Sequence, residues 1–93
     1  MNARSIPRLA RGCRLYEDPA QGWVLLIPEG VLRLSGPGPR ILQHCDGACT
    51  FADIVCQLCA EFGAADRARV ETETAGFLER LAARRIVVLE CIA

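Results

Sequence analysis

The sequence predicts an α+β domain of winged-helix type, in which a three-stranded antiparallel sheet is followed by three helices. Three observations support this fold class. Short apolar runs separated by turn residues fill residues 13–34, amphipathic helical patterns fill residues 39–85, and the main strand signals precede the helical ones. The 93 residues are 52% apolar, which suffices for one small core. We expect a flexible tail over residues 1–7 and a single domain over residues 8–93.

Three β-prone stretches predict the strands. The first lies around residues 13–16, the second covers Trp23–Ile27 and the third covers Val31–Leu34. Pro28-Glu29-Gly30 joins the last two as a tight turn, because proline presets φ and glycine tolerates positive φ. A Gly/Pro-rich break at residues 35–39 follows the third strand. The edge of this strand therefore has no partner next in sequence, and we expect it to be open.

Capping residues mark the first two helices. A short helix is predicted over Pro39–Asp46 and is ended by Gly47, which tolerates the left-handed conformation. Thr50 and Asp53 resemble a capping box that opens a second helix, and Gly63 ends it. The apolar face of the second helix comprises Phe51, Ile54, Val55, Leu58, Cys59 and Phe62. We expect four of these residues to be buried against the sheet: Phe51, Ile54, Leu58 and Phe62.

A third helix begins after Asp66, which is a favourable N-cap residue. Its apolar positions are Val70, Thr74, Phe77, Leu78 and Leu81. Arg84 and Arg85 lie at its C-terminal end, where the helix dipole favours cations. The interleaved Glu and Arg residues of this helix are typical of a solvated face. Ile86–Leu89 is a short apolar segment that forms either an extra strand or a cover for the core.

Charge and hydropathy argue against several classes of function. Eleven basic and eleven acidic residues cancel, so we expect no general attraction to nucleic acid or anionic lipid. No apolar run is long enough to span a bilayer, and the basic N-terminus lacks the apolar region of a secretory signal. We therefore expect a cytoplasmic protein, in which thiols stay reduced and six cysteines do not indicate disulfides.

Soft metal ligands are concentrated in one stretch of sixteen residues, which contains His44, Cys45, Cys49, Cys56 and Cys59. A zinc site would take pairs of ligands from turns, whereas Cys56 and Cys59 lie inside the second predicted helix. A thioredoxin-like site would need its C-x-x-C at a helix N-terminus. We therefore expect no metal, no cofactor and no catalytic residue, and we interpret these cysteines as packing or surface thiols.

Several stretches, taken in order, resemble the PqqD family of pyrroloquinoline-quinone biosynthesis proteins. They are RLARGCRLYED, GWVLLIPEGVLRLS, ILQHCDG, TFADIVCQLCAEFG and FLERLAARRIV, and together they extend over about residues 7–89. The most specific parts are Trp23-Val24-Leu25-Leu26 running into Pro28-Glu29-Gly30-Val31, and Cys45-Asp46-Gly47. This resemblance implies a non-catalytic peptide chaperone rather than an enzyme.

The resemblance also implies partners and a binding site. A PqqD-like protein would bind the leader of the pyrroloquinoline-quinone precursor peptide and present it to a radical S-adenosylmethionine enzyme of the same pathway. The leader would add as a strand to the third strand, beside the third helix. Alternation puts Leu32 and Leu34 on one face of that strand and Val31 and Arg33 on the other. The expected peptide-binding residues are Val31, Leu32, Arg33, Leu34, Val70, Thr74, Phe77 and Leu81.

Two other functions stay open. A winged helix that binds DNA would use the third helix, but the balance of Arg and Glu there dilutes the basic face that phosphates require. A self-associating regulatory module would form a homodimer by pairing two copies through the open strand edge. Leader binding, salt-dependent DNA binding and concentration-dependent dimerisation distinguish the three functions.

Overall fold

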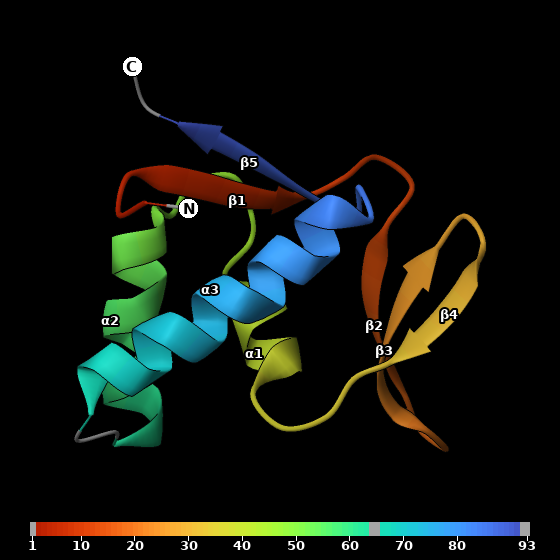
Figure 1. The fold of residues 1–93 in the computed structure, drawn as a ribbon. Coiled ribbons are helices and arrows are strands. Elements are labelled where there is room, and N and C mark those ends of the chain that lie inside the picture. Colours follow the sequence, from red (N-terminus) through yellow and green to blue (C-terminus); the bar gives the residue numbers. More distant parts are fainter. Residues whose placement is uncertain (1, 64–65, 92–93) are drawn as a thin grey trace.

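The computed structural model describes residues 2–63 and 66–91, which form two small antiparallel sheets and three helices (Figure 1). In chain order the elements are β1 (Ser5–Leu9), β2 (Arg14–Asp18), β3 (Gly22–Ile27), β4 (Gly30–Arg33), α1 (Gly38–Gln43), α2 (Phe51–Phe62), α3 (Arg67–Ala83) and β5 (Val87–Cys91). The predicted α+β class is confirmed. None of the helices in the described ranges is long and apolar enough to cross a membrane.

The predicted meander is formed by β2, β3 and β4, with β3 in the centre. Leu25 of β3 pairs with Leu32 of β4 and is completely buried. Leu32 and Leu34 lie on the same side and pack against the core. Val31 lies on the opposite side and is 56% exposed. The alternation predicted for the third strand is therefore confirmed.

The N-terminal segment forms a second sheet, so the flexible tail predicted over residues 1–7 is wrong from Ser5 onward. Strand β1 pairs in antiparallel orientation with β5, and both Ser5 and Pro7 are buried. The partner strand comes from the far end of the chain, and a local pattern cannot reveal such a partner. Strand β5 confirms the strand interpretation of the segment after Ile86, which is itself buried.

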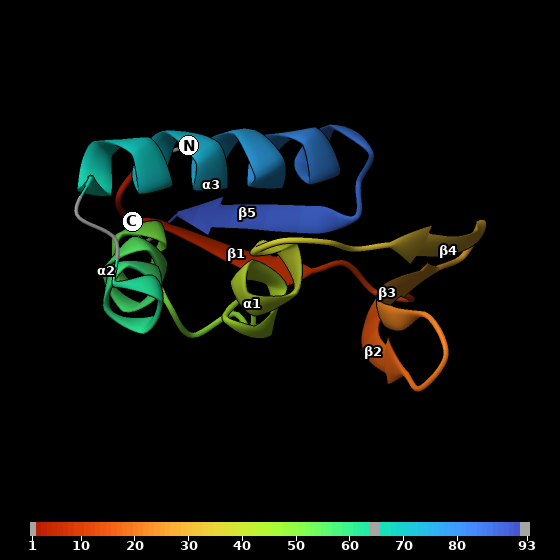
Figure 2. The same ribbon diagram turned by 90° about the horizontal axis from the view of Figure 1, so that it is seen from below.

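The core lies between the helices and the two sheets, and its largest fully buried side chains include Leu25, Ile54 and Leu78. Helix α2 contacts α3, α1 and β1. In Figure 2 the meander lies at one end of the molecule and α2 at the other. The prediction that α2 packs against the meander is therefore wrong, because α1 and β1 lie between α2 and the meander. Phe62, which ends α2, is also not buried: it is 57% exposed.

The helix caps follow the predicted signals with one exception. The Thr50 hydroxyl accepts the N–H of Asp53, and the Asp53 carboxylate accepts the N–H of Thr50, so the capping box is confirmed. Gly63 ends α2 with a φ of 61°, and the Asp66 carboxylate accepts the N–H of Arg69. Helix α1, however, ends at Gln43, before the predicted Asp46.

Removing the Thr50 hydroxyl tests the capping box. Thr50→Ala is expected to lower the free energy of unfolding by about 1 kcal/mol, because the N–H of Asp53 loses its acceptor. Urea unfolding followed by circular dichroism measures the change. Thr72→Ala is the matched control, since the exposed Thr72 hydroxyl only donates to the Ala68 carbonyl within α3. Equal midpoints for wild type and Thr50→Ala would contradict the capping role.

Cys45 is a packing residue beneath α1. Its thiol is 5% exposed and donates to the Ile41 carbonyl over 3.3 Å. Burial, with smaller contributions from Asp46 and Cys49, raises the pKa of the Cys45 thiol to about 12. Cys56, by contrast, lies exposed in the middle of α2. Within the described residues, no three His, Cys, Asp or Glu side chains are grouped so that they could hold a metal ion.

The raised pKa of Cys45 predicts a loss of stability in alkaline solution. Below pH 9 the thiol is neutral in both the folded and the unfolded chain. Above pH 9 the thiol ionises in the unfolded chain only, so the loss of stability grows with pH up to about pH 12 and is constant beyond it. The free energy of unfolding should fall by roughly 1 kcal/mol between pH 9 and pH 10 through this group. Urea titrations of wild type and Cys45→Ala across this range measure the effect. The variant should lose this part of the slope, and identical slopes would contradict the prediction.

Candidate functional site

Strand β4 offers an open edge. Among the described residues its only strand partner is β3. Leu34 donates its N–H to the Trp23 carbonyl over 3.0 Å, so this position points its backbone toward β3. Because backbone direction alternates along an antiparallel strand, Leu32 also points toward β3, whereas Val31 and Arg33 point away. The N–H and C=O groups of Val31 and Arg33 are therefore available to a further strand.

An apolar groove begins where the chain leaves β4. It has a volume of about 1020 Å³ and is called the α3 groove below. It is lined by residues 35–38 and Ile41, by Leu58 and Phe62 of α2, and by one face of α3 from Val70 to Arg80. Figure 2 shows the segment that follows β4 running from the meander back to α1. The segment that follows β4 thus leads from the open edge to residues 35–38 in the wall of the groove.

The four predicted α3 residues do not behave alike. Val70, Thr74 and Phe77 line the α3 groove. Leu81 is 8% exposed, belongs to the core and is not among the lining residues. Leu32 and Leu34 of the β4 region are half-buried against the core and lie beside the groove rather than in its wall.

Several lining residues were not expected from the sequence. Phe62 has the apolar spacing of a core residue, yet it lies at the end of α2 and contributes an exposed ring to the α3 groove. Gly38 has a distinct role, because a Cβ there would lie 3.4 Å from the Phe77 ring. The Gly/Pro-rich break after β4 could have indicated that this segment lines the groove, since a close approach to the backbone commonly requires glycine.

Charged side chains flank the α3 groove. Glu73 is paired with Arg69 at 3.2 Å. Arg80, which lies farther along α3, takes part in no ion pair within the described residues. The uncompensated charge along this helix face is therefore positive.

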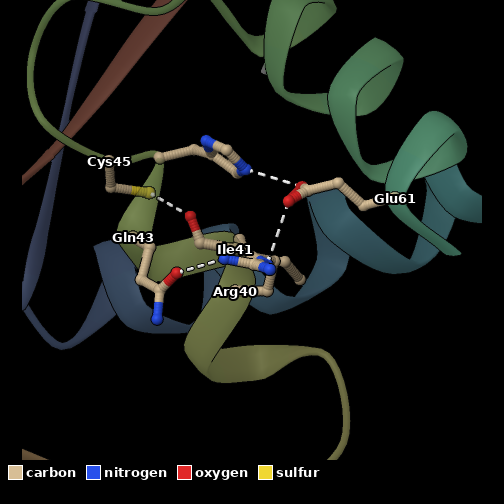
Figure 3. A network of polar contacts seen from close by, with 6 residues as sticks. Arg40, Ile41, Gln43, Cys45 and Glu61 are labelled. Carbon is tan, nitrogen blue, oxygen red and sulfur yellow. Dashed lines mark hydrogen bonds and ion pairs between the residues drawn. The ribbon is translucent and has the colours of Figure 1, made fainter.

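A polar network joins α1 to α2 (Figure 3). The Glu61 carboxylate lies 3.0 Å from Arg40 Nε and 2.9 Å from His44 Nε2. Arg40 also donates to the Gln43 side chain over 2.7 Å. Because α1 and α2 both line the groove, this network fixes the relative position of its walls. His44, the one histidine, thus has a structural contact at the end of α1.

This site is suited to binding a peptide in an extended conformation. An open strand edge supplies sequence-tolerant backbone hydrogen bonds, and an adjoining apolar groove selects side chains. The predicted third strand supplies the open edge, and three of the four predicted α3 residues line the α3 groove.

A family model and individual relatives both indicate the same protein family. The sequence model described as coenzyme PQQ synthesis protein D (PqqD) matches residues 22–87. A PqqA binding protein of Rhodopseudomonas palustris is 43% identical over 77 residues, which are 82% of this chain and 74% of that protein. A PqqA binding protein of Xanthomonas axonopodis pv. citri is 37% identical over 86 residues, which are 91% of this chain and 92% of that protein.

Solved structures agree in fold. The solution structure of the PqqD truncation of Methylobacterium extorquens PqqCD, a stand-alone recognition element for ribosomally synthesized and post-translationally modified peptides, has a TM-score of 0.75. It is 34% identical, with 88% of this chain and 87% of that chain covered. Lasso peptide synthetase B1 complexed with its leader peptide has a TM-score of 0.73 at 20% identity, covering 89% of this chain and 98% of that one. The second likeness shows the fold alone.

Proposed function

The chain belongs to the PqqD family, and from this membership we propose that it is a peptide chaperone of pyrroloquinoline-quinone biosynthesis. It binds the leader of the precursor peptide PqqA by strand addition and presents the precursor to the radical S-adenosylmethionine enzyme of the same pathway. The relatives are named for binding PqqA, which supports a binding role rather than catalysis by this chain.

The open β4 edge is the observation that carries the proposal. An added antiparallel strand would exchange backbone hydrogen bonds with Val31 and Arg33, whose N–H and C=O groups point away from β3. Its side chains would then alternate between two environments. Those on one side meet the face that carries Leu32 and Leu34, and those on the other side meet Val31 and Arg33 themselves.

Helix α3 supplies the side-chain selectivity in this proposal. Val70, Thr74 and Phe77 line the α3 groove and would contact apolar side chains of the leader. Leu81 would act from the core, by supporting the helix beneath the site. An antiparallel leader would have its N-terminal part near Leu34, because the two strands run in opposite directions. This part of the leader is therefore the one nearest to the α3 groove.

A titration with synthetic PqqA tests the proposal. Amide signals of residues 31–34 and of α3 should shift in NMR spectra of the labelled chain, and the shifts should saturate. A single added strand must order a flexible peptide, so we expect a dissociation constant of roughly 0.1–10 μM. Unmoved amides at residues 31–34 under saturating peptide would refute the site. Salt-dependent shifts with duplex DNA, or peptide-independent dimerisation through β4, would favour the two alternative functions.

A further inference from the structure

The outer face of the meander is a second exposed surface, distinct from the α3 groove. Strand pairing sets Tyr16 beside Val24, and Leu26 beside Val31. Tyr16 is 44% exposed and Val31 is 56% exposed, so they are two of the three exposed large apolar residues in the described part of the chain. Val24 is buried at 3% exposure and Leu26 is half-buried between them. Together with neighbouring polar residues, the four side chains line a hollow of about 260 Å³.

Two guanidinium groups flank this apolar cluster. Arg14 pairs with Leu26 across β2 and β3, and Arg33 pairs with Val24 across β3 and β4. Directly paired residues share a face of the sheet, so both arginines lie on the outer face. Neither of them takes part in an ion pair within the described residues.

The one carboxylate that lines the hollow is already engaged. Asp18 accepts the backbone N–H groups of residues 20 and 21 over 2.7 and 3.1 Å. It holds the turn between β2 and β3 and, within the described residues, forms no ion pair with either arginine. The two arginines outnumber the Asp18 carboxylate, so the outer face keeps a net positive charge around an apolar centre.

We propose that the outer face, defined by Arg14, Tyr16, Val24, Leu26, Val31 and Arg33, docks the enzyme that modifies the bound peptide. The chemistry of this face calls for an enzyme surface with apolar side chains flanked by carboxylates. This inference rests on the proposed function, because it needs a peptide on the β4 edge. A leader strand on β4 would extend the same face, so the docked enzyme would contact both the chaperone and the leader.

A second copy of the chain fits this face poorly. Two identical outer faces would bring four arginines against only two Asp18 carboxylates, and the excess of like charge across the interface is unfavourable. The leader itself is accommodated at the edge and the α3 groove. A carboxylate-bearing partner protein is therefore the occupant that the charges favour.

Charge reversal at Arg14 tests the inference, because Arg14 lies on β2, away from the β4 edge. The probes are synthetic PqqA and the pathway's purified radical S-adenosylmethionine enzyme from the same organism, with affinities measured by calorimetry. Arg14→Glu should bind the enzyme roughly tenfold more weakly and lose most of its salt dependence. Arg4→Glu, an exposed charge reversal next to β1, should bind the enzyme as wild type does. Both variants should bind PqqA normally, which also shows that they are folded.

The outcomes separate the two proposals. Equal enzyme affinity for wild type and Arg14→Glu, or no enzyme binding by a PqqA-competent wild type, overturns the docking face and leaves peptide recognition intact. Failure of wild type to bind PqqA overturns the proposed function and, with it, the docking face that rests on it. Tyr16→Thr, which keeps strand propensity, should weaken enzyme binding in the same direction. Dimerisation abolished by Tyr16→Thr would assign the face to a second copy instead.

Discussion

Replacing Arg33 with proline is expected to weaken binding of the PqqA leader by about 10- to 100-fold. The Arg33 N–H points away from β3, and in the proposed complex it donates to the added strand. Proline has no N–H, so a carbonyl of the leader would lose its partner, and the ring would occupy the space where the strand lies. The fold should survive, since proline is tolerated on the open side of an edge strand.

Two further variants make the Arg33 test specific. Arg33→Ala removes the same side chain but keeps the N–H, so it should bind the leader much more tightly than Arg33→Pro. Leu32→Pro instead removes an N–H that points toward β3, and should destabilise the meander itself. Calorimetric titration and thermal melting of all three variants separate binding from folding. Equal leader affinity for Arg33→Ala and Arg33→Pro would refute strand addition at β4.

Truncating Leu58 is expected to lower the free energy of unfolding by about 2–5 kcal/mol. Leu58 is 2% exposed and lies between the core and the floor of the α3 groove. Leu58→Ala removes buried methyl groups and leaves a cavity that the surrounding helices fill only in part. The loss is a large share of the stability that small domains possess, typically about 5–15 kcal/mol. Chemical denaturation gives the value directly.

Phe62 is the matched control, because it lies one helical turn beyond Leu58 on the same face of α2. Phe62→Ala should change stability far less than Leu58→Ala, since the ring is 57% exposed. It should instead weaken leader binding, because the ring lines the α3 groove near the N-terminal part of the leader. Comparable losses of stability in both variants would show that Phe62 is packed in solution.

The two proposed surfaces have different partners: the β4 edge would bind the leader, and the outer face would bind the enzyme. The β4 edge offers the backbone of Val31 and Arg33, whereas the outer face offers side chains that include the same two residues. A leader on the edge would therefore alter the surface that the enzyme meets. Because the docked enzyme would also contact the leader, we expect the enzyme to bind the loaded chaperone more tightly than the empty one.

The locally coded features of this fold were predictable. A two-residue turn after Ile27 joins β3 to β4, the Thr50–Asp53 capping box opens α2, and Gly63 ends it. Each of these features depends on residues that are neighbours in the sequence, so its physics is visible there. The apolar period of α2 likewise identified Ile54 and Leu58 as core residues.

Features that depend on distant partners were not predictable in the same way. Residues 5–7 resemble a tail until β5 supplies a strand to pair with them. Phe62 and Leu81 both have the apolar spacing of their helices, yet one is exposed in the groove and the other is buried. Periodicity defines a face of a helix, but the packing of α2 against α3 and β1 decides how far along that face burial extends.

The sequence by itself determined that an antiparallel meander with an open third strand precedes three helices. Its resemblance to the PqqD family added the prediction that this strand and the third helix form the candidate site. The sequence left two possibilities for the backbone groups that point to the open edge. Only the tertiary structure decided between them, because the bond from Leu34 to Trp23 sets the register that turns Val31 and Arg33 outward. The register results from pairing between strands, and a one-residue shift in it would reverse every backbone direction and every face.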